Sequence, residues 1–323
     1  MEKAGILHSK HNRQLLLRRK SEVVFVYIFL LIFIIAAIFL SDRFLMERNI
    51  RNLIISNIGL LFVAYGQLFI VLLGGVDLSV GSVISLTNVI CVTLITDNPA
   101  TWGIALIASL AAGAGVGLIN GLLVVKGKLQ PIIATLATQT FFAGVALYIM
   151  PGPTGILPSE LCRFITRGWN STFPLLLTVV VSVVIWLLLN RSRFGKAVLA
   201  TGGNEQSAKS SGIPVGIVKI KAFIFTSLMA TISGLFITAY ATSGSPLIGE
   251  AYSQRSITAA VVGGAALAGG KGSVVGCIAA AGILGIVNNL LNLRGVSSYY
   301  QYVLQGVILI LALAISAIRT NRK

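Results

Sequence analysis

Long apolar runs alternate with short polar segments along the whole chain. The runs cover residues 23–40, 52–73, 80–96, 102–125, 131–150, 174–190, 221–241, 255–269, 273–293 and 299–318. Runs of about 20 apolar residues are typical of helices that cross a bilayer. Glycine interrupts several runs, which a membrane tolerates only where protein or a water-filled cavity covers the backbone. The pattern predicts an all-α polytopic membrane protein with about ten transmembrane helices.

Composition supports this class. Of the 323 residues, 56% are hydrophobic and 11% are charged, whereas about 25% are charged in ordinary soluble domains. This excludes a soluble enzyme, a disordered chain and a fibrous protein. The net charge of +16 would indicate nucleic acid for a soluble chain. In a membrane protein, basic residues concentrate in cytoplasmic loops, so we expect a lipid bilayer and no nucleic acid as partner.

The basic residues also orient the chain. Ten helices place both termini on one side, and the segments on that side hold 18 of the 25 Lys and Arg. These segments are 1–22, 126–130, 191–221, 270–272 and 319–323. The positive-inside rule therefore predicts cytoplasmic tails at 1–22 and 319–323 around a transmembrane domain at 23–318. The run at 23–40 is too long for a cleaved signal peptide, so we expect a retained first helix.

Cysteine and histidine offer no cofactor chemistry. Cys91, Cys162 and Cys277 are far apart in sequence, and His8 and His11 both lie in the N-terminal tail. An odd number of widely spaced cysteines gives no disulfide framework or zinc motif. We expect no metal, no cofactor and no catalytic site.

Two segments of the chain resemble each other. Residues 117–127 and 285–295 share two glycines, an asparagine, two leucines and a basic residue, at an offset of 168 positions. Five helices separate the two segments, so the copies would run in opposite directions. This predicts an inverted-topology repeat, which is common in transporters. The alternative is coincidence within a sequence rich in glycine and leucine.

The segment at residues 74–82 joins the second and third predicted helices around an acidic residue. A charge at membrane depth is costly and is a candidate for function. Asp77 also stands at a helix start, where its carboxylate can accept from the amide of Ser79 or Val80. Gly74, Gly75 and Gly81 would allow a tight turn and close helix packing. Capping with packing, and direct substrate contact, are the two interpretations.

The inside loop at residues 191–220 predicts one short helix outside the bilayer. Asn204 is a good N-cap, and Glu205 favours a first helical turn. Gly212 fits a left-handed C-terminal position, and Pro214 blocks continuation. Two turns are not stable alone, so the small face formed by Ser207, Ala208 and Ser211 would dock on a partner. The alternative is a merely solvated loop.

A glycine-rich segment at residues 263–273 is similar to a phosphate loop but does not fit one. Ala265 stands where glycine is required, and Gly272 stands where Ser or Thr is required. The chain therefore lacks an ATP site of its own, and we expect these glycines to form a turn between two helices at the inside surface.

Amides gather in the ninth predicted helix, which holds Asn288, Asn289 and Asn292. Amides in apolar helices either line a wet pathway or hydrogen-bond neighbouring helices together, and we treat the three as pathway candidates. Tyr299 and Tyr300 follow, and fit either a pathway or an aromatic belt at the membrane interface.

Four of these motifs together resemble one family. Residues 74–82, 202–213, 260–272 and 292–301 are similar, in this order, to the permease subunits of ribose-type monosaccharide ABC importers, and the resemblance spans about 23–318. The chain departs from the usual pattern at Val76, where Ile is common, and at Gln206-Ser207, where Ala is frequent. Neither change alters the assignment.

The resemblance implies a bacterial inner-membrane subunit with specific partners. These are two cytoplasmic ABC ATPase subunits, a second permease copy or paralogue, and a periplasmic or lipid-anchored sugar-binding protein. The ATPase-docking residues of the family correspond to Gly202, Gly203, Asn204, Glu205, Ala208 and Gly212. Gly74, Gly75, Asp77, Ser79 and Gly81 are the structural or gating candidates.

The implied mechanism is alternating access driven by ATP hydrolysis in the partner subunits. An ion-coupled secondary sugar transporter is the alternative, and it would need acids or histidines within the helices. Asp77 is the one candidate for such a role. A membrane-embedded enzyme would need a nucleophile–base or metal constellation, which the sequence lacks.

Overall fold

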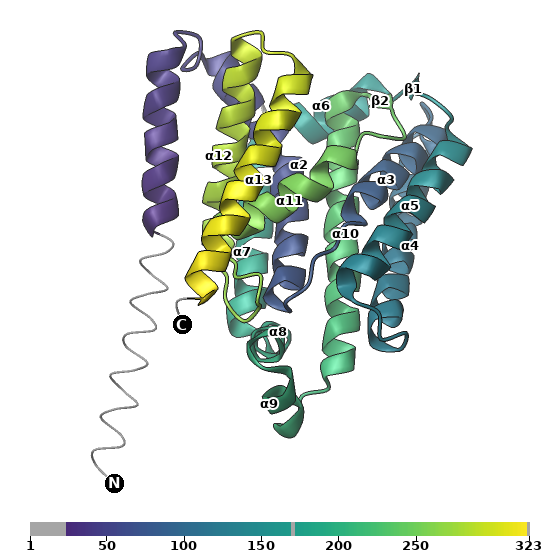
Figure 1. Ribbon diagram of the computed structural model, residues 1–323. Helices are drawn as coiled ribbons and strands as arrows, with labels where there is room; N and C mark the ends of the chain where they lie inside the picture. Colours follow the sequence, from purple (N-terminus) through teal and green to yellow (C-terminus); the bar gives the residue numbers. More distant parts are fainter. Residues whose placement is uncertain (1–23, 169–171, 322–323) are drawn as a thin grey trace.

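The computed structural model describes residues 24–168 and 172–321, which are almost entirely helical (Figure 1). Each predicted apolar run overlaps a helix, so the all-α prediction is confirmed. These helices are Val24–Leu40, α2 (Glu47–Leu72), α3 (Val80–Leu94), α4 (Ala100–Val125), α5 (Pro131–Ile149), α7 (Thr172–Arg191), α10 (Val215–Ala241), α11 (Glu250–Val262), α12 (Val274–Leu293) and α13 (Ser298–Asn321). The tail at 1–22 lies outside the described residues.

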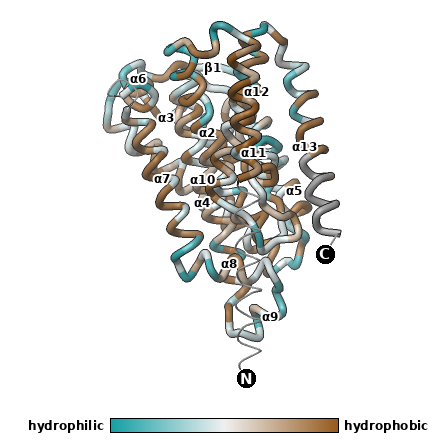
Figure 2. The backbone as a smooth tube through the Cα atoms, turned by 90° about the vertical axis from the view of Figure 1, so that its left-hand side faces the viewer, coloured by the Kyte–Doolittle hydropathy of each residue, from teal (hydrophilic) through white to brown (hydrophobic). Residues whose placement is uncertain are grey.

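Short elements cap the two ends of the bundle. At one end lie α6 (Ser159–Arg167) and an antiparallel pair of strands, β1 (Thr154–Ile156) and β2 (Ser243–Gly244). At the other end lie α8 (Arg193–Gly203) and α9 (Glu205–Ser210). We call these the α6 end and the α9 end (Figure 1). Hydrophobic residues fill the helices between the two ends, and hydrophilic residues gather at the ends (Figure 2).

Six of the described helices are long and apolar enough to cross a membrane by length and composition: α2, α4, α5, α7, α10 and α12. Two others are too short. With 15 residues in α3 and 13 in α11, each helix is about 20 Å long at 1.5 Å per residue, against a hydrocarbon core of about 30 Å. Both begin within the bundle, after segments of non-helical backbone.

The predicted helix at 255–269 is wrong at its C-terminal end, because α11 stops at Val262. Gly263 is its C-cap, and Gly264 has a φ of 92°. This left-handed conformation suits glycine and turns the chain out of the helix. Residues 263–273 then form the turn expected between the two helices.

The inverted repeat is confirmed by the packing of α2–α5 against α10–α13. The halves meet where α3 and α11 begin, and each donates a backbone N–H to a serine hydroxyl of the other. Gly81 N bonds Ser253 Oγ at 3.1 Å, and Gly249 N bonds Ser85 Oγ at 3.0 Å. Gly249 and Ser253 each lie 168 positions after their counterparts, which is the offset read from the sequence.

Each half of the repeat also packs its third helix on the first helix of the other half. Gly113, Gly117 and Gly121 of α4 lie directly against α10. In the same way Gly285 of α12 lies against Asn57 of α2, whose Nδ2 donates to the carbonyl of Ala281 at 2.8 Å. Small residues allow the helix backbones to approach closely. The two halves are therefore interlocked rather than side by side.

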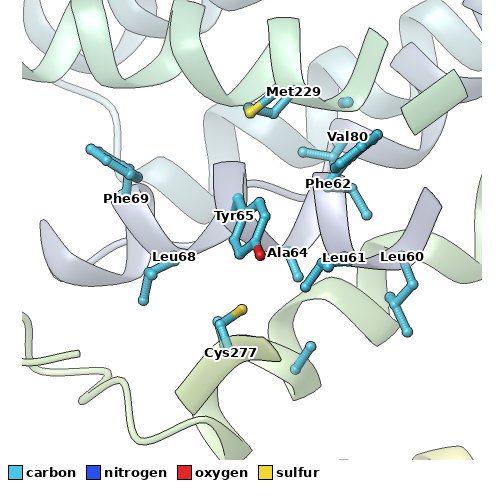
Figure 3. Close-up of a cluster of buried hydrophobic side chains, with 14 of the residues drawn as sticks. Leu60, Leu61, Phe62, Ala64, Tyr65, Leu68, Phe69, Val80, Met229 and Cys277 are labelled. Carbon is cyan, nitrogen blue, oxygen red and sulfur yellow. The ribbon is translucent and has the colours of Figure 1, made fainter. Parts of the chain in front are cut away.

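The centre of the core lies along α2, which is buried from Ile58 to Leu72. Tyr65 lies between Met229 of α10 and Cys277 of α12 (Figure 3). Its hydroxyl is 2.6 Å from Ser182 Oγ on α7, so the polar tip of this buried ring has a partner.

Candidate functional site

The short helix α9 forms as the local sequence predicts. The Asn204 side chain accepts from Ser207 N at 2.8 Å and caps the helix. Gly212 has a φ of 79°, and the following N–H, of Ile213, bonds the carbonyl of Ala208 at 3.0 Å. The cap and the glycine thus fix both ends of a helix that would not be stable alone.

Glu205 joins α9 to the start of α10. Its carboxylate pairs with Lys219 Nζ at 2.7 Å and with Lys209 Nζ at 3.0 Å. The hydrogen bond from Lys219, and then that from Lys209, lowers the pKa of Glu205, so the carboxylate stays ionised at neutral pH. The candidate docking residue is therefore also part of an internal link.

The predicted small docking face is wrong in one respect. Ser207 and Ser211 are exposed, but Ala208 is buried within the chain. Ala208 therefore packs α9 onto its own bundle and is not presented to a partner.

Gly202 and Gly203 differ sharply although they are adjacent. Both belong to α8, a helix that the sequence analysis missed by treating residues 191–203 as loop. A Cβ on Gly202 would overlap the carbonyl oxygen of Leu72, the last residue of α2, whereas a Cβ on Gly203 would meet nothing within 4 Å. Gly202 is thus a packing residue, and Gly203 lies at the surface with Asn204 and Gly212.

Non-helical backbone at residues 73–79 leads from α2 back into the bundle. Gly74 has a φ of 77° and approaches the carbonyl of Ala268. Gly75 packs against Pro131, with a Cβ placed there only 3.1 Å from the proline ring. The predicted turn and close packing are therefore present, and the segment contacts both the 263–273 turn and the start of α5.

Asp77 is fully buried at the end of a directed chain of hydrogen bonds. Thr138 Oγ1 donates to Asn120 Oδ1 at 2.6 Å, and Asn120 Nδ2 donates to Ser79 Oγ at 2.8 Å. Ser79 then donates to Asp77 Oδ1 from its hydroxyl at 2.6 Å and from its amide at 2.8 Å. The chain ties the 73–79 segment to α4 and α5.

Two features of Asp77 were not evident from the sequence. The buried side-chain amide of Gln67 bonds the backbone of Asp77 twice. With its nitrogen oriented toward the Asp77 carbonyl oxygen, it donates to that oxygen at 3.0 Å and accepts from the Asp77 N–H at 3.1 Å. The other carboxylate oxygen, Oδ2, has no hydrogen-bond partner among the described residues. Polar residues such as Gln67 and Asn120, within otherwise apolar runs, were the available signal for these contacts.

Asp77 is not the N-cap of α3: that position is held by Ser79, and no side chain caps the helix. The bonds from Ser79 to Asp77 instead favour a structural role within the 73–79 segment, which predicts that Asp77→Asn is tolerated. Asparagine keeps the oxygen that accepts from Ser79, so folded yield and transport should stay near wild type. Asp77→Leu removes the acceptor, strands two buried donors and should cost about 1–3 kcal/mol of stability for each. Thermal unfolding in detergent and uptake assays measure both variants. A folded but inactive Asp77→Asn protein would show instead that the charge itself is required.

The asparagines of α12 both bond neighbouring helices and line a cavity. Asn289 and Asn49 of α2 exchange amide hydrogen bonds at 2.8 and 3.1 Å. Asn288 Oδ1 accepts from Gln305 at 3.1 Å, and Asn292 Oδ1 accepts from Gln301 at 2.8 Å. All three asparagines line a cavity of about 440 Å³ near the α6 end.

The two tyrosines that follow lie elsewhere. Tyr299 and Tyr300, at the start of α13, are exposed and do not line this cavity, which favours their interpretation as an interface belt.

Apolar spanning helices, an inverted repeat and polar groups buried at breaks in the helices define a polytopic membrane permease. Comparison with known families agrees. Residues 49–313 match the family described as "Branched-chain amino acid transport system / permease component", and the chain belongs to this family.

Individual relatives match over nearly their whole length. The chain is 37% identical over 296 residues to the ribose import permease protein of Bacillus subtilis (strain 168), covering 89% of this chain and 90% of the relative. It is 36% identical over 302 residues to the L-arabinose transport system permease protein of Escherichia coli (strain K12), covering 92% and 90%. The D-allose transport system permease protein of the same strain is 32% identical over 292 residues, covering 89% and 90%. No solved structure matches the chain.

Proposed function

We propose that the chain is the membrane-spanning subunit of an ABC importer that moves a monosaccharide such as ribose into the cytoplasm. Relatives named as ribose, arabinose and allose permeases support the substrate class. Two separate ABC ATPase subunits would supply the energy, a second permease copy or paralogue would complete the pore, and a sugar-binding protein would deliver the substrate.

The α9 end would face the cytoplasm of a bacterial inner membrane, with both termini on that side. The excess of Lys and Arg in the segments that the sequence predicts to be cytoplasmic supports this orientation. The start of helix Val24–Leu40 and the end of α13 both point toward the α9 end (Figure 1). This agrees with a chain that crosses the membrane an even number of times.

The position of α9 is the observation that carries the proposal. This helix projects from the bundle (Figure 1), and the residues that flank it, Gly203, Asn204 and Gly212, are exposed. Behind it, the Glu205–Lys219 pair connects it to α10, which packs along α2, α3 and α4. An ATPase that moved α9 would therefore move α10, and alternating access would follow from that displacement.

Breaking the α9 link should uncouple ATP hydrolysis from transport. Glu205→Gln removes the charge that holds Lys209 and Lys219, and Gly212→Ala places a side chain at a positive φ, at about 1–2 kcal/mol. In proteoliposomes with the complete transporter, we expect sugar uptake to fall several-fold in both variants while membrane insertion and ATP hydrolysis persist. Gln206→Ala, at an exposed neighbouring position, is the control. Unchanged uptake in both variants would refute a coupling role for α9.

The same uptake assay tests the alternative of an ion-coupled secondary transporter, for which Asp77 is the candidate residue. Its unpartnered Oδ2 is the observation that favours this alternative, because a buried carboxylate can carry a proton or bind a cation. Uptake that persists without ATP and collapses with the ion gradient would establish it in place of the ABC mechanism.

A further inference from the structure

The cavity near the α6 end has a counterpart near the α9 end. The second cavity, of about 620 Å³, is lined by Val124 and Val125 at the end of α4, with residues from the end of α2 and the start of α10. The first cavity is lined by Asn292 and Leu293 at the end of α12, with residues from the end of α10 and the start of α2. Three repeat-related pairs line both cavities: Val124 and Asn292, Val125 and Leu293, and Phe223 and Ile55. The inverted repeat therefore places a hollow at each end, each with its own lining.

The helices α12 and α4, whose ends line the two hollows, differ at matching positions. Asn289 of α12 corresponds to Gly121 of α4, and Asn292 corresponds to Val124. Gly121 packs directly on Ile220, and Val124 is buried in an apolar cluster. The α4 copy thus packs without these two amides, whereas the counterpart of Asn288 is Asn120, an asparagine buried in the hydrogen-bond chain of Asp77. The asparagines of α12 give the cavity near the α6 end a lining of amides, whereas its counterpart is lined by the charged residues Lys128, Glu205, Lys209 and Lys219. We call the cavity near the α6 end the amide-lined cavity.

Hydrogen-bond donors in the amide-lined cavity remain available for a ligand. Asn288 and Asn292 use their oxygens to accept from Gln305 and Gln301, and no described residue accepts from their Nδ2 groups. Asn52 also lines the cavity. Each amide nitrogen carries two N–H donors, which suits a ligand with several acceptor oxygens.

An aromatic ring and a fixed cation complete the lining. Arg255 Nε donates to Gln305 Oε1 at 2.9 Å, and the guanidinium carbon lies 5.7 Å from the centre of the Tyr252 ring. These contacts hold the guanidinium in place and leave its terminal nitrogens free to donate. Amides with an arginine beside an aromatic face suit a neutral sugar, whose hydroxyls accept hydrogen bonds and whose C–H face packs on a ring.

We infer that the amide-lined cavity is a carbohydrate-binding site within a single copy of the chain. The inference rests on the proposed function, since it names where the permease itself would contact the sugar. The site would receive the sugar at the end opposite α9. Its affinity would come from the amides at positions 288 and 292 and from Arg255, with Tyr252 as the apolar surface.

Protection of a cysteine from labelling tests the site. Ser56 lines the cavity, and the native Cys91, Cys162 and Cys277 are buried, so Ser56→Cys gives a specific reporter. The complete transporter, reconstituted without the binding protein, is treated with a water-soluble maleimide and ribose, arabinose or allose. At a sugar concentration of twice the dissociation constant, labelling should slow about threefold, because about one third of the sites remain free.

Two further variants separate sugar binding from general perturbation. Adding Asn292→Val installs the residue that the α4 copy has at Val124, and it should abolish protection. Adding Asn190→Val makes the same change at the end of α7, away from the cavity, and should leave protection intact. The inference is wrong if no neutral sugar protects Ser56→Cys, if only a sugar phosphate does, or if protection survives Asn292→Val.

ATP-driven uptake by the same proteoliposomes, with the binding protein added, tests the proposed function separately. Uptake without protection would overturn the cavity assignment alone. Absence of ATP-driven uptake for every sugar tested would overturn the proposed function.

Discussion

Gly202→Ala should prevent correct assembly of the α9 end, whereas Gly203→Ala should leave folding nearly unchanged. A Cβ on Gly202 would overlap the carbonyl oxygen of Leu72 and lie 2.8 Å from Gly270 N. These two groups already bond each other at 2.8 Å, so three backbone segments meet at this point. Overpacking a core typically costs about 1–3 kcal/mol, and we expect at least the upper end because backbone atoms cannot rotate away.

The adjacent glycine provides the control for this experiment. Gly203→Ala adds the same methyl group where nothing lies within 4 Å, at a helical position where alanine is favoured over glycine by up to about 1 kcal/mol. The midpoint of thermal unfolding in detergent should therefore drop for Gly202→Ala only. Equal behaviour of the two variants would mean that the contact between α8, α2 and the 263–273 turn is not structurally important.

The long helices could be predicted from the sequence because lipid imposes a simple rule on them. A spanning segment must satisfy its backbone internally and present apolar side chains, so the length and hydrophobicity of each run give its position. Helix α8 was not predicted because it lies outside the long apolar runs, so their length and hydrophobicity say nothing about it. Gly195, Gly202 and Gly203 resemble loop residues, although Ser192 caps the start of the helix by accepting from Gly195 N at 2.9 Å, a local signal that the sequence analysis did not use.

Some features of the candidate site have local causes and could be predicted from the sequence, whereas others depend on tertiary contacts and could not. The cap at Asn204 and the positive φ at Gly212 are set by a few neighbouring residues, so the sequence alone predicted α9. The burial of Ala208 and the two hydrogen bonds between the Gln67 side chain and the Asp77 backbone depend on segments that meet only in the folded bundle. The repeat lies between these cases, since its offset was readable in residues 117–127 and 285–295, while the interlocking of the halves was not.

The second large loss of stability is expected where α3 and α11 of the two interlocked halves cross. A Cβ on Gly249 would overlap the carbonyl oxygen of Gly81 and lie 2.8 Å from the Cβ of Ile84. A Cβ on Gly81 would lie 2.7 Å from the carbonyl oxygen of Gly249. Separating the two helices would also break the bonds to Ser253 and Ser85, so neither glycine can be replaced without moving one half against the other.

We therefore expect Gly249→Ala and Gly81→Ala to lose both folded yield and uptake, by more than the ~3 kcal/mol typical of severe overpacking. Gly115→Ala is the matched control, because Gly115 lies within α4 with nothing within 4 Å of its added Cβ and should gain up to about 1 kcal/mol from helix propensity. Size-exclusion profiles with thermal unfolding in detergent measure the difference. Wild-type stability and uptake in Gly249→Ala would show that α3 and α11 are not in direct contact. No side-chain rearrangement can relieve a clash between the added Cβ and the backbone of the other helix.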